Sequence, residues 1–251
     1  MSIADASCFS AIPDLLRTGA LDRSYGGLIE VRRHPVEPLV LLNYSMACRY
    51  KQVWDDVTRW CRGLVVDTRC WSVAALPFRK FFSLNESPET RLDRLPDEPF
   101  MVFEKLDGSL GISYLGADGV AVATRGAFDS REAQAGTAAL RGLRGSHDLP
   151  ASVTFLFEIL DVGGRLRSPE VVLLGAVDRE SGRDLEWPEV EAWAHRIGCR
   201  TPTIHSFCSL PEVLEARRAL PSSKEGFVVR FVSGLRVKVK GAAYLAERSV
   251  G

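Results

Sequence analysis

The stretch Glu104-Lys105-Leu106-Asp107-Gly108-Ser109 connects two segments rich in apolar residues, Met101–Leu106 and Leu110–Leu115. Both segments have strand-like composition, and an Asp-Gly pair between two strands is typical of a tight hairpin turn. The stretch therefore predicts a β-hairpin that turns at Asp107-Gly108. Two interpretations of Lys105 stay open: a solvated side chain on the hairpin surface, or a nucleophile at a strand end. An amine attacks only after it has lost its proton, so a nucleophilic lysine needs other positive groups around it.

The rest of the chain predicts mainly short strands with a few helices. Connections are short and strands do not alternate with helices, which favours an α+β fold with mostly antiparallel sheets flanked by helices. No linker rich in Pro, Gly and Ser divides the sequence, so we expect one domain over residues 1–251. The further predicted strands are Leu28–Arg32, Pro38–Asn43, Leu64–Asp67, Val120–Thr124, Val153–Leu160, Val171–Val177, and a hairpin of Phe227–Val232 with Leu235–Lys240. The predicted helices are Lys51–Trp60, Ser130–Leu143, Trp187–Ile197 and Pro211–Leu220, the last capped by Ser209.

Composition limits the class of protein. With 251 residues, 46% hydrophobic and 25% charged, the chain resembles an ordinary soluble globular protein. A formal net charge of +0 excludes a strongly basic nucleic-acid wrapper, although not a local basic groove. No signal peptide and no membrane-spanning stretch are expected, and the scattered cysteines predict reduced thiols in a cytoplasmic protein. Four histidines without metal-ligand spacing make a protein-built zinc site an unfavoured interpretation.

Lysine is rare in this sequence. Of 32 basic residues only six are lysine, and arginine cannot replace a lysine that must lose its proton. We attribute Lys51 and Lys224 to chance. Lys80 lies in an aromatic run, and Lys238 and Lys240 alternate with valine, so both ammonium groups leave one face of a strand. The alternative for this pair is an amphipathic edge strand with charges in water.

Two carboxylates and one further cation stand out. Glu158 interrupts an apolar strand, where burial is costly unless the carboxylate is paired or accepts hydrogen bonds. Glu225 precedes Gly226 at the mouth of a strand, which suits a group that contacts a metal or a ribose. Arg62 lies at the edge of another strand. A buried ion pair and a turn carboxylate are the simpler interpretations of the two glutamates.

In this order the residues resemble the covalent nucleotidyltransferase superfamily, which comprises ATP-dependent ligases and mRNA-capping guanylyltransferases. The resemblance is closest to the phage-type RNA ligase 1 group and runs from about residue 43 to residue 241. The superfamily motifs K-x-D-G, F-E, E-G-x-V and K-x-K match Lys105–Gly108, Phe157-Glu158, Glu225–Val228 and Lys238–Lys240. Segments characteristic of the RNA ligase group match Cys61–Leu64, Pro77–Phe82, Thr124–Gly126 and Leu173–Gly182.

The resemblance implies a nucleotidyltransferase domain and a three-step reaction with ATP and Mg²⁺ or Mn²⁺. Lys105 attacks the α-phosphate of ATP and forms a lysyl-adenylate. AMP then moves to the 5′-phosphate of an RNA, and a 3′-hydroxyl attacks to form a phosphodiester. The implied partner is RNA with 5′-phosphate and 3′-hydroxyl ends, and no membrane is involved.

The resemblance also implies a role for each matched residue. Arg62 and Lys80 contact ribose and phosphates, the Glu104 backbone holds adenine, Asp107 and Gly108 shape the nucleophile loop, and Glu158 binds ribose hydroxyls. Glu225 contacts a metal through water, Lys238 and Lys240 hold the α-phosphate, Lys240 assists the leaving group, and Arg125 and Arg165 bind RNA phosphate or triphosphate.

Departures from the family pattern leave alternatives open. Only ten residues follow Gly241, so we expect neither a C-terminal oligonucleotide-binding barrel nor a helical C-terminal domain. A DNA ligase or a capping-type nucleotidyltransferase is one alternative, and a non-catalytic nucleotide- or RNA-binding module is another. The sequence leaves open a partner chain or an end-healing kinase or phosphatase, and residues 1–42 match no motif.

Overall fold

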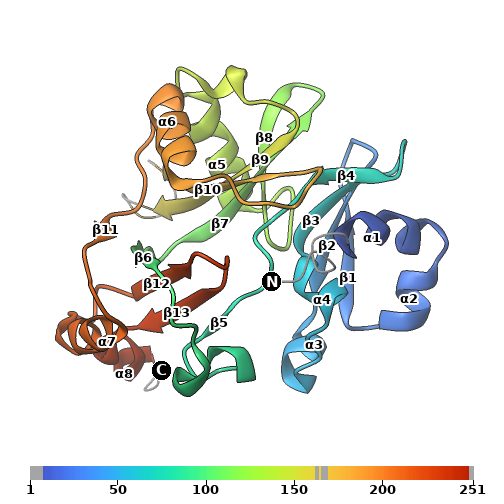
Figure 1. Cartoon of the computed structure of the whole chain (residues 1–251). Coiled ribbons are helices and arrows are strands. Elements are labelled where there is room, and N and C mark those ends of the chain that lie inside the picture. Colours follow the sequence, from blue (N-terminus) through green and yellow to red (C-terminus); the bar gives the residue numbers. More distant parts are fainter. Residues whose placement is uncertain (1–7, 162–163, 165–168, 249–251) are drawn as a thin grey trace. The chain divides into compact units, whose positions relative to one another are not determined.

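The computed structural model describes residues 8–161, 164 and 169–248, which form two compact units (Figure 1). The small unit contains Phe81–Asp107 and the described chain from Pro202 onward. The large unit contains the described chain up to Lys80 and Gly108–Thr201. Each unit has its own sheets and is described by itself below. The expectation of one domain over the whole chain stays a prediction.

The small unit is built on one sheet in the order β11-β6-β12-β13-β5. All pairings are antiparallel except that of β13 with β5. Its strands are β5 (Phe82–Ser83), β6 (Phe100–Lys105), β11 (Ile204–His205), β12 (Gly226–Phe231) and β13 (Arg236–Lys240). Its helices are α7 (Leu210–Ala219), α8 (Ala242–Arg248) and two 3-10 turns, Pro88–Thr90 and Leu92–Arg94.

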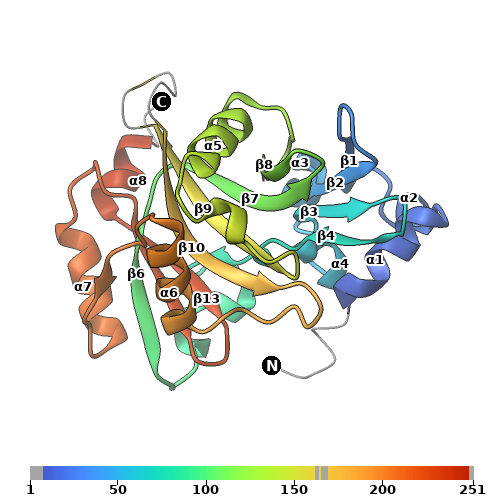
Figure 2. The ribbon, with the colours of Figure 1, turned by 90° about the horizontal axis from the view of Figure 1, so that it is seen from above.

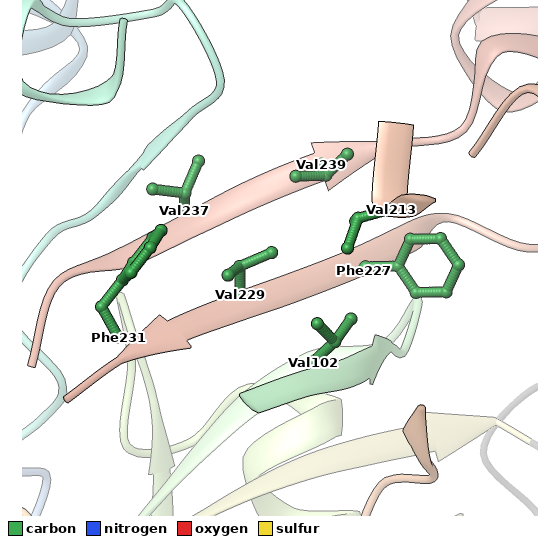
Figure 3. Packing of buried hydrophobic residues seen from close by; sticks show 7 residues of the cluster. All are labelled: Val102, Val213, Phe227, Val229, Phe231, Val237 and Val239. Carbon is green, nitrogen blue, oxygen red and sulfur yellow. The ribbon is translucent and has the colours of Figure 1, made fainter. Parts of the chain in front are cut away.

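Valine and lysine alternate along β13, which places the valines in the core of the small unit. Val237 and Val239 are buried, whereas Lys238 and Lys240 lie on the opposite face and are half-buried. Figure 3 shows the two valines beside side chains from β6 and β12, with Val213 of α7 reaching the same cluster. Because β13 lies between β12 and β5, the alternative of an edge strand is wrong. The hairpin predicted around Ser233-Gly234 is confirmed.

The large unit contains two four-stranded antiparallel sheets. The first, in the order β1-β2-β3-β4, consists of β1 (Ile29–Arg33), β2 (Leu39–Tyr44), β3 (Arg62–Asp67) and β4 (Ser72–Ala75). The helices beside it are α1 (Cys8–Arg17), α2 (Ala20–Tyr25), α3 (Met46–Lys51) and α4 (Asp56–Trp60). The rings of Phe9 on α1 and Trp60 on α4 meet edge to face with centroids 5.3 Å apart. Helix α1 packs against β4, and α4 packs against β2 and β3.

The second sheet has the order β10-β9-β7-β8 and carries α5 and α6 (Figure 2). Gly136 on α5 allows a close helix–sheet approach, because an added Cβ would lie 2.7 Å from Ile159 Cδ1. The elements are β7 (Ser109–Gly116), β8 (Gly119–Thr124), α5 (Arg131–Arg141), the 3-10 turn Ser146–Asp148, β9 (Val153–Asp161), β10 (Pro169–Asp178) and α6 (Trp187–Ile197). The predicted α+β class with mostly antiparallel sheets is confirmed. Among the described helices, none has both the length and the apolar character needed to cross a bilayer.

The predicted hairpin at Asp107-Gly108 is wrong. Strand β6 pairs with β11 and β12, whereas β7 pairs with β8 and β9, so the two strands belong to different sheets. Gly108 serves a close approach instead of a turn, because an added Cβ would lie 2.4 Å from the carbonyl oxygen of Ile159. Asp-Gly therefore marks the point where the chain leaves one sheet and enters another.

The predicted helix Lys51–Trp60 is also wrong in its bounds, since the structure has α3 and α4 on either side of a break. Gln52 adopts a left-handed backbone with φ 53° and ends α3, and Asp55 caps α4 by accepting from the Thr58 N–H at 2.8 Å. A cap at Asp55 requires extended backbone where a continuous helix would run. Sequence patterns did not predict α1, α2, α8, β4, β5 or β11.

Candidate active site

One buried carboxylate bridges two lysines in the small unit. Lys105 Nζ lies 2.5 Å from Glu225 Oε2, and Lys240 Nζ lies 3.3 Å from Glu225 Oε1. The Glu225 side chain is buried, and both of its oxygens face an ammonium group. A carboxylate is stable in such a place only when it is paired in this way. Two ammonium groups around one carboxylate leave an excess positive charge, which favours an anion such as phosphate.

Strand register explains how these three residues meet. Gly226 at the start of β12 pairs with Lys105 on β6 and with Lys240 on β13. The adjacent residue, Glu225, is thereby placed between the two lysines. Gly226 has φ 140°, and an added Cβ would lie 2.3 Å from the Val239 carbonyl oxygen. Only glycine fits there without strain, so the E-G pair has a geometric reason.

Lys238 contacts Phe81 of the small unit, whereas Lys240 contacts Glu225. Its Nζ donates to the Phe81 carbonyl oxygen at 3.2 Å and lies 4.6 Å from the centroid of the Phe81 ring. It shares a strand face with Lys240, as alternation predicted, but only Lys240 reaches Glu225. The two lysines of the K-x-K motif therefore have different surroundings, which sequence alone did not distinguish.

A second charged group surrounds Tyr244 on α8. Arg248 Nη2 lies 2.6 Å from Asp107 Oδ2, and the Arg248 guanidinium lies 4.6 Å from the Tyr244 ring centroid. Lys240 Nζ lies 5.8 Å from the same centroid. Burial, followed by Glu225 and by Asp107, raises the pKa of Tyr244 to about 12. The sequence analysis missed Tyr244 and Arg248, although an aromatic residue four positions after Lys240 at a helix start could have drawn attention.

Glu104, which precedes the predicted nucleophile, is held on the small unit. Its Oε1 lies 2.5 Å from Lys224 Nζ, and its Oε2 accepts from the Thr203 hydroxyl at 3.1 Å. Its backbone N–H donates to the Thr203 carbonyl at 2.7 Å, so this donor is already used within the sheet. Lys224 therefore has a structural partner, and the chance interpretation overlooked it. The adenine role of the Glu104 backbone stays a prediction.

In the large unit, Arg62, Arg125 and Tyr44 form a cation–aromatic group. Arg125 Nη1 donates to the Tyr44 hydroxyl at 2.9 Å, and its guanidinium lies 5.1 Å from the Tyr44 ring centroid. Burial lowers the pKa of Arg62 and neighbouring Arg125 lowers it further, whereas Tyr44 and Glu158 oppose the shift. A buried guanidinium beside a second one is costly without anionic neighbours. This arrangement suits a group that receives phosphate, and the sequence analysis did not include Tyr44 in it.

Lys80 belongs to the same unit and is buried, with 7% of its surface exposed. Its Nζ lies 5.3 Å from the Trp54 ring centroid, and Trp54 in turn meets Tyr44 edge to face at 5.0 Å. The predicted aromatic surroundings of Lys80 are therefore present, although the partner is Trp54. A desolvated ammonium over an indole ring gains from the electrostatic attraction of the ring face.

Glu158 lies on β9 and is half-buried, so the expected burial among apolar residues is only partial. Its Oε1 accepts from the Gly108 N–H at 2.9 Å. The carboxylate therefore fixes the start of β7, beside the close approach of Gly108 to Ile159. Arg165 lies outside the described residues. The roles assigned to all these residues from the family resemblance stay predictions.

The described residues contain no cluster of three or more His, Cys, Asp or Glu side chains suited to hold a metal ion. Both oxygens of Glu225 already face ammonium groups. Mg²⁺ in nucleotide-dependent enzymes is commonly held by one or two carboxylates, waters and substrate phosphates. A contact of Glu225 with such a cation, made through water, stays a prediction.

A family model described as RNA ligase matches residues 60–244. This range is more than half of the chain and includes Arg62, Lys105, Glu158, Glu225 and Lys240. The chain belongs to the RNA ligase family, which confirms the motif resemblance.

A protein of Thermovibrio ammonificans named "Putative RNA ligase" is 28% identical to this chain over 202 residues. The match covers 76% of this chain and 52% of the relative. This chain therefore spans about half the length of that curated relative.

Solved structures of ligases share the fold. An archaeal ATP-dependent RNA ligase has a TM-score of 0.65 and 15% identity. The match covers 95% of this chain and 67% of the archaeal chain. A "Putative ATP-dependent DNA ligase" from Aquifex aeolicus has a TM-score of 0.66 and 16% identity, covering 94% and 64%. An RNA ligase from Naegleria gruberi with ATP and Mn has a TM-score of 0.53 and 16% identity, covering 69% and 60%. At these identities the likeness confirms the nucleotidyltransferase-like fold and nothing further.

Proposed function

We propose that this chain is the nucleotidyltransferase part of an ATP-dependent RNA ligase, with Lys105 as its nucleophile. The observation that carries the proposal is the bridge from Lys105 through Glu225 to Lys240. A lysine on a strand end, held by a buried carboxylate beside a second lysine, combines a nucleophile with a site for an anion. Membership of the RNA ligase family supplies the reaction class.

In the first step Lys105 loses a proton to solvent water, its nitrogen bonds to the α-phosphorus of ATP, and the bond from that phosphorus to the pyrophosphate oxygen breaks. The negative charge of the α-phosphate competes with Glu225 for the two ammonium groups. Lys240 stays as a cation for the α-phosphate and the leaving pyrophosphate. Stabilising such charge is the largest contribution that a protein makes to phosphoryl and nucleotidyl transfer.

The divalent cation, when bound with the nucleotide, supplies neutralisation of phosphate charge. Glu225 would hold it through water. The Naegleria gruberi ligase was solved with ATP and Mn, so Mn²⁺ is the alternative to Mg²⁺ in this proposal. Release of Lys105 from Glu225 would then leave the amine available for attack.

In the second step AMP moves from Lys105 to the 5′-phosphate of an RNA, and the third step joins that end to a 3′-hydroxyl with release of AMP. The large unit supplies further candidates for contacts with nucleotide and RNA. Glu158 binds ribose hydroxyls, Arg62 and Lys80 bind ribose and phosphates, and Arg125 binds RNA phosphate or triphosphate. RNA repair in the cytoplasm is the expected setting, with RNA specificity supplied in part by another chain or segment.

An end-joining experiment tests the proposed substrate. Purified protein with ATP and Mg²⁺ is given 5′-phosphorylated RNA strands and, separately, DNA strands of the same sequence. Joined RNA with little joined DNA supports the proposal. Joined DNA alone would favour the DNA ligase alternative, and covalent labelling by GTP in place of ATP would favour a capping-type enzyme.

A further inference from the structure

Helix α3 presents a large aromatic side chain to solvent. Tyr50 is 90% exposed and Met46, one turn before it, is 68% exposed. Residues four apart lie on the same face of a helix, so the two side chains form one outward stripe. Cys48 is the buried residue that anchors the helix. A tyrosine so completely exposed contributes little to folding, which calls for another explanation of its place.

Both residues next to Tyr50 in the sequence carry a positive charge. Arg49 and Lys51 flank it, both exposed, and within the described part of the chain neither forms an ion pair with a carboxylate. The nearest acids in sequence are engaged elsewhere: Asp55 caps α4, and Asp56 pairs with Arg79. An exposed ring between two uncompensated cations matches a polyanion whose bases can stack.

Side-chain hydrogen bonds hold the backbone at both ends of helix α3. At its start, the Ser45 hydroxyl donates to the Gly27 carbonyl at 2.6 Å and accepts from the Cys48 N–H at 3.1 Å. At its end, left-handed Gln52 donates through its side chain to the Arg49 carbonyl at 2.7 Å. Non-glycine residues keep such backbone only where the surroundings fix it, often near binding sites.

The same residues connect α3 to the cationic group of the large unit. Gln52 Oε1 accepts from the Trp54 indole N–H at 3.1 Å. The Trp54 ring contacts Tyr44 and the Lys80 ammonium, and Tyr44 accepts from Arg125. The exposed stripe is thus linked by direct contacts to cations proposed to receive phosphates. Figure 1 shows α3 following β2 directly in this unit.

We propose that Tyr50, with Arg49 and Lys51, forms a binding surface for single-stranded RNA. Tyr50 stacks on a base, and the two cations contact the flanking phosphates. Stacking of this kind is tolerant of sequence, because every base has a π-face. The inference rests on the proposed RNA-joining function and adds to it a surface that the family motifs do not include.

Fluorescence anisotropy with a 5′-phosphorylated single-stranded RNA of about 12 nucleotides, labelled at its 3′ end, tests the surface. We expect Tyr50→Ala to raise the RNA Kd about tenfold or more and Tyr50→Phe, which keeps the ring, to change it less than about twofold. Replacing both Arg49 and Lys51 by glutamine should lower the slope of log Kd against log salt by about 0.7 for each lost phosphate contact. Replacing both Arg144 and Arg183, two exposed arginines in other segments of the large unit, by glutamine removes the same charge and is the matched control, which should leave Kd and slope unchanged.

Lysyl-adenylate formation from ATP is measured in parallel and should be the same in all these variants. RNA binding by Tyr50→Ala equal to that of the wild type would overturn the surface while leaving the proposed function intact, and would point to a protein contact instead. A wild type that binds no RNA would overturn the surface as well. Failure of the proposed function is detected separately, as a wild type that neither labels with ATP nor joins RNA.

Discussion

The amino group of Lys105 lies 2.5 Å from the carboxylate of Glu225, a residue 120 positions later in the chain. The contact joins the first residue of the K-x-D-G motif to the first residue of the E-G-x-V motif, and Lys240 completes it from the K-x-K motif. Three sequence motifs therefore meet at one carboxylate. If Lys105 is the nucleophile, as proposed above, its ion pair with Glu225 must break before the amine attacks.

Replacing Lys105, the proposed nucleophile, should abolish adenylation without lowering the stability of the fold. Lys105→Arg keeps a positive charge beside Glu225 but loses the amine that attacks, so we expect no covalent AMP and a melting temperature close to that of the wild type. Gel labelling and calorimetry on the same preparation check both. Residual lysyl-adenylate in this variant would remove Lys105 from its assigned role.

The two lysines of β13 should differ. Lys240→Ala removes a cation that contacts Glu225, so we expect adenylation to fall about 100-fold or more, as for loss of a charge-stabilising group. Lys238→Ala loses a contact with the Phe81 carbonyl and ring, so we expect a smaller loss accompanied by lower stability. Single-turnover rates with matched melting curves distinguish the two. Equal losses of rate without loss of stability would show that Lys238 acts on the phosphate in the same way as Lys240.

Two variants of Glu158 distinguish loss of its hydrogen bond to Gly108 from loss of its negative charge alone. Glu158→Gln keeps an oxygen that can accept from the Gly108 N–H, whereas Glu158→Ala loses it. A hydrogen bond to a charged group is worth about 1.5–3 kcal/mol, so we expect Glu158→Ala to lower the adenylation rate by about 10-fold to 100-fold. Glu158→Gln should retain more activity. Wild-type labelling by the alanine variant would exclude Glu158 from the nucleotide site.

Gly226 is predicted to be intolerant of any side chain. Its φ of 140° and the 2.3 Å approach to the Val239 carbonyl mean that Gly226→Ala forces β12 away from β13. We expect a loss of about 1–3 kcal/mol, which corresponds to roughly 2–4 °C per kcal/mol in melting temperature. Gly234→Ala is the matched control, since Gly234 also has positive φ but nothing within 4 Å of an added Cβ. An equal effect at both positions would show that backbone conformation, and not the contact with Val239, sets the cost.

Tyr244 gives a prediction for pH dependence. Because its pKa is raised to about 12, the phenol stays protonated where an ordinary tyrosine, with a pKa of about 10, begins to ionise. The unfolded state therefore gains stability above about pH 10, and the wild type should lose stability relative to Tyr244→Phe as pH rises toward 12. Below about pH 10 the two proteins should show the same shape of adenylation profile. Urea unfolding across this range checks the first expectation, and a difference that is constant with pH would contradict it.

Local pattern predicted some of this structure correctly. The alternation Val237-Lys238-Val239-Lys240 and the turn at Ser233-Gly234 both depend on neighbours in sequence, and the hairpin they indicate is confirmed. The hairpin at Asp107-Gly108 was wrong because strand pairing is decided by distant partners. Strand β12, more than a hundred residues later, pairs with β6 where the turn signal predicted β7.

Contacts within the candidate site also depend on residues that are distant in the sequence. Motifs indicated Lys105, Glu225 and Lys240 one at a time, but their contacts depend on the register around Gly226, which no local pattern contains. Tyr44 and Tyr244 were missed for a related reason. Neither tyrosine belongs to a motif, and only tertiary packing places a cation over each ring.

Whether Lys105 forms a covalent adenylate is tested by incubating the protein, freed of bound nucleotide, with α-labelled ATP and Mg²⁺ beside Lys105→Ala. After denaturing electrophoresis we expect label on the wild type, none on the variant, and release of the label when pyrophosphate is added. Label that persists in Lys105→Ala, or a nucleotide-free wild type that takes no label from ATP, would contradict this expectation.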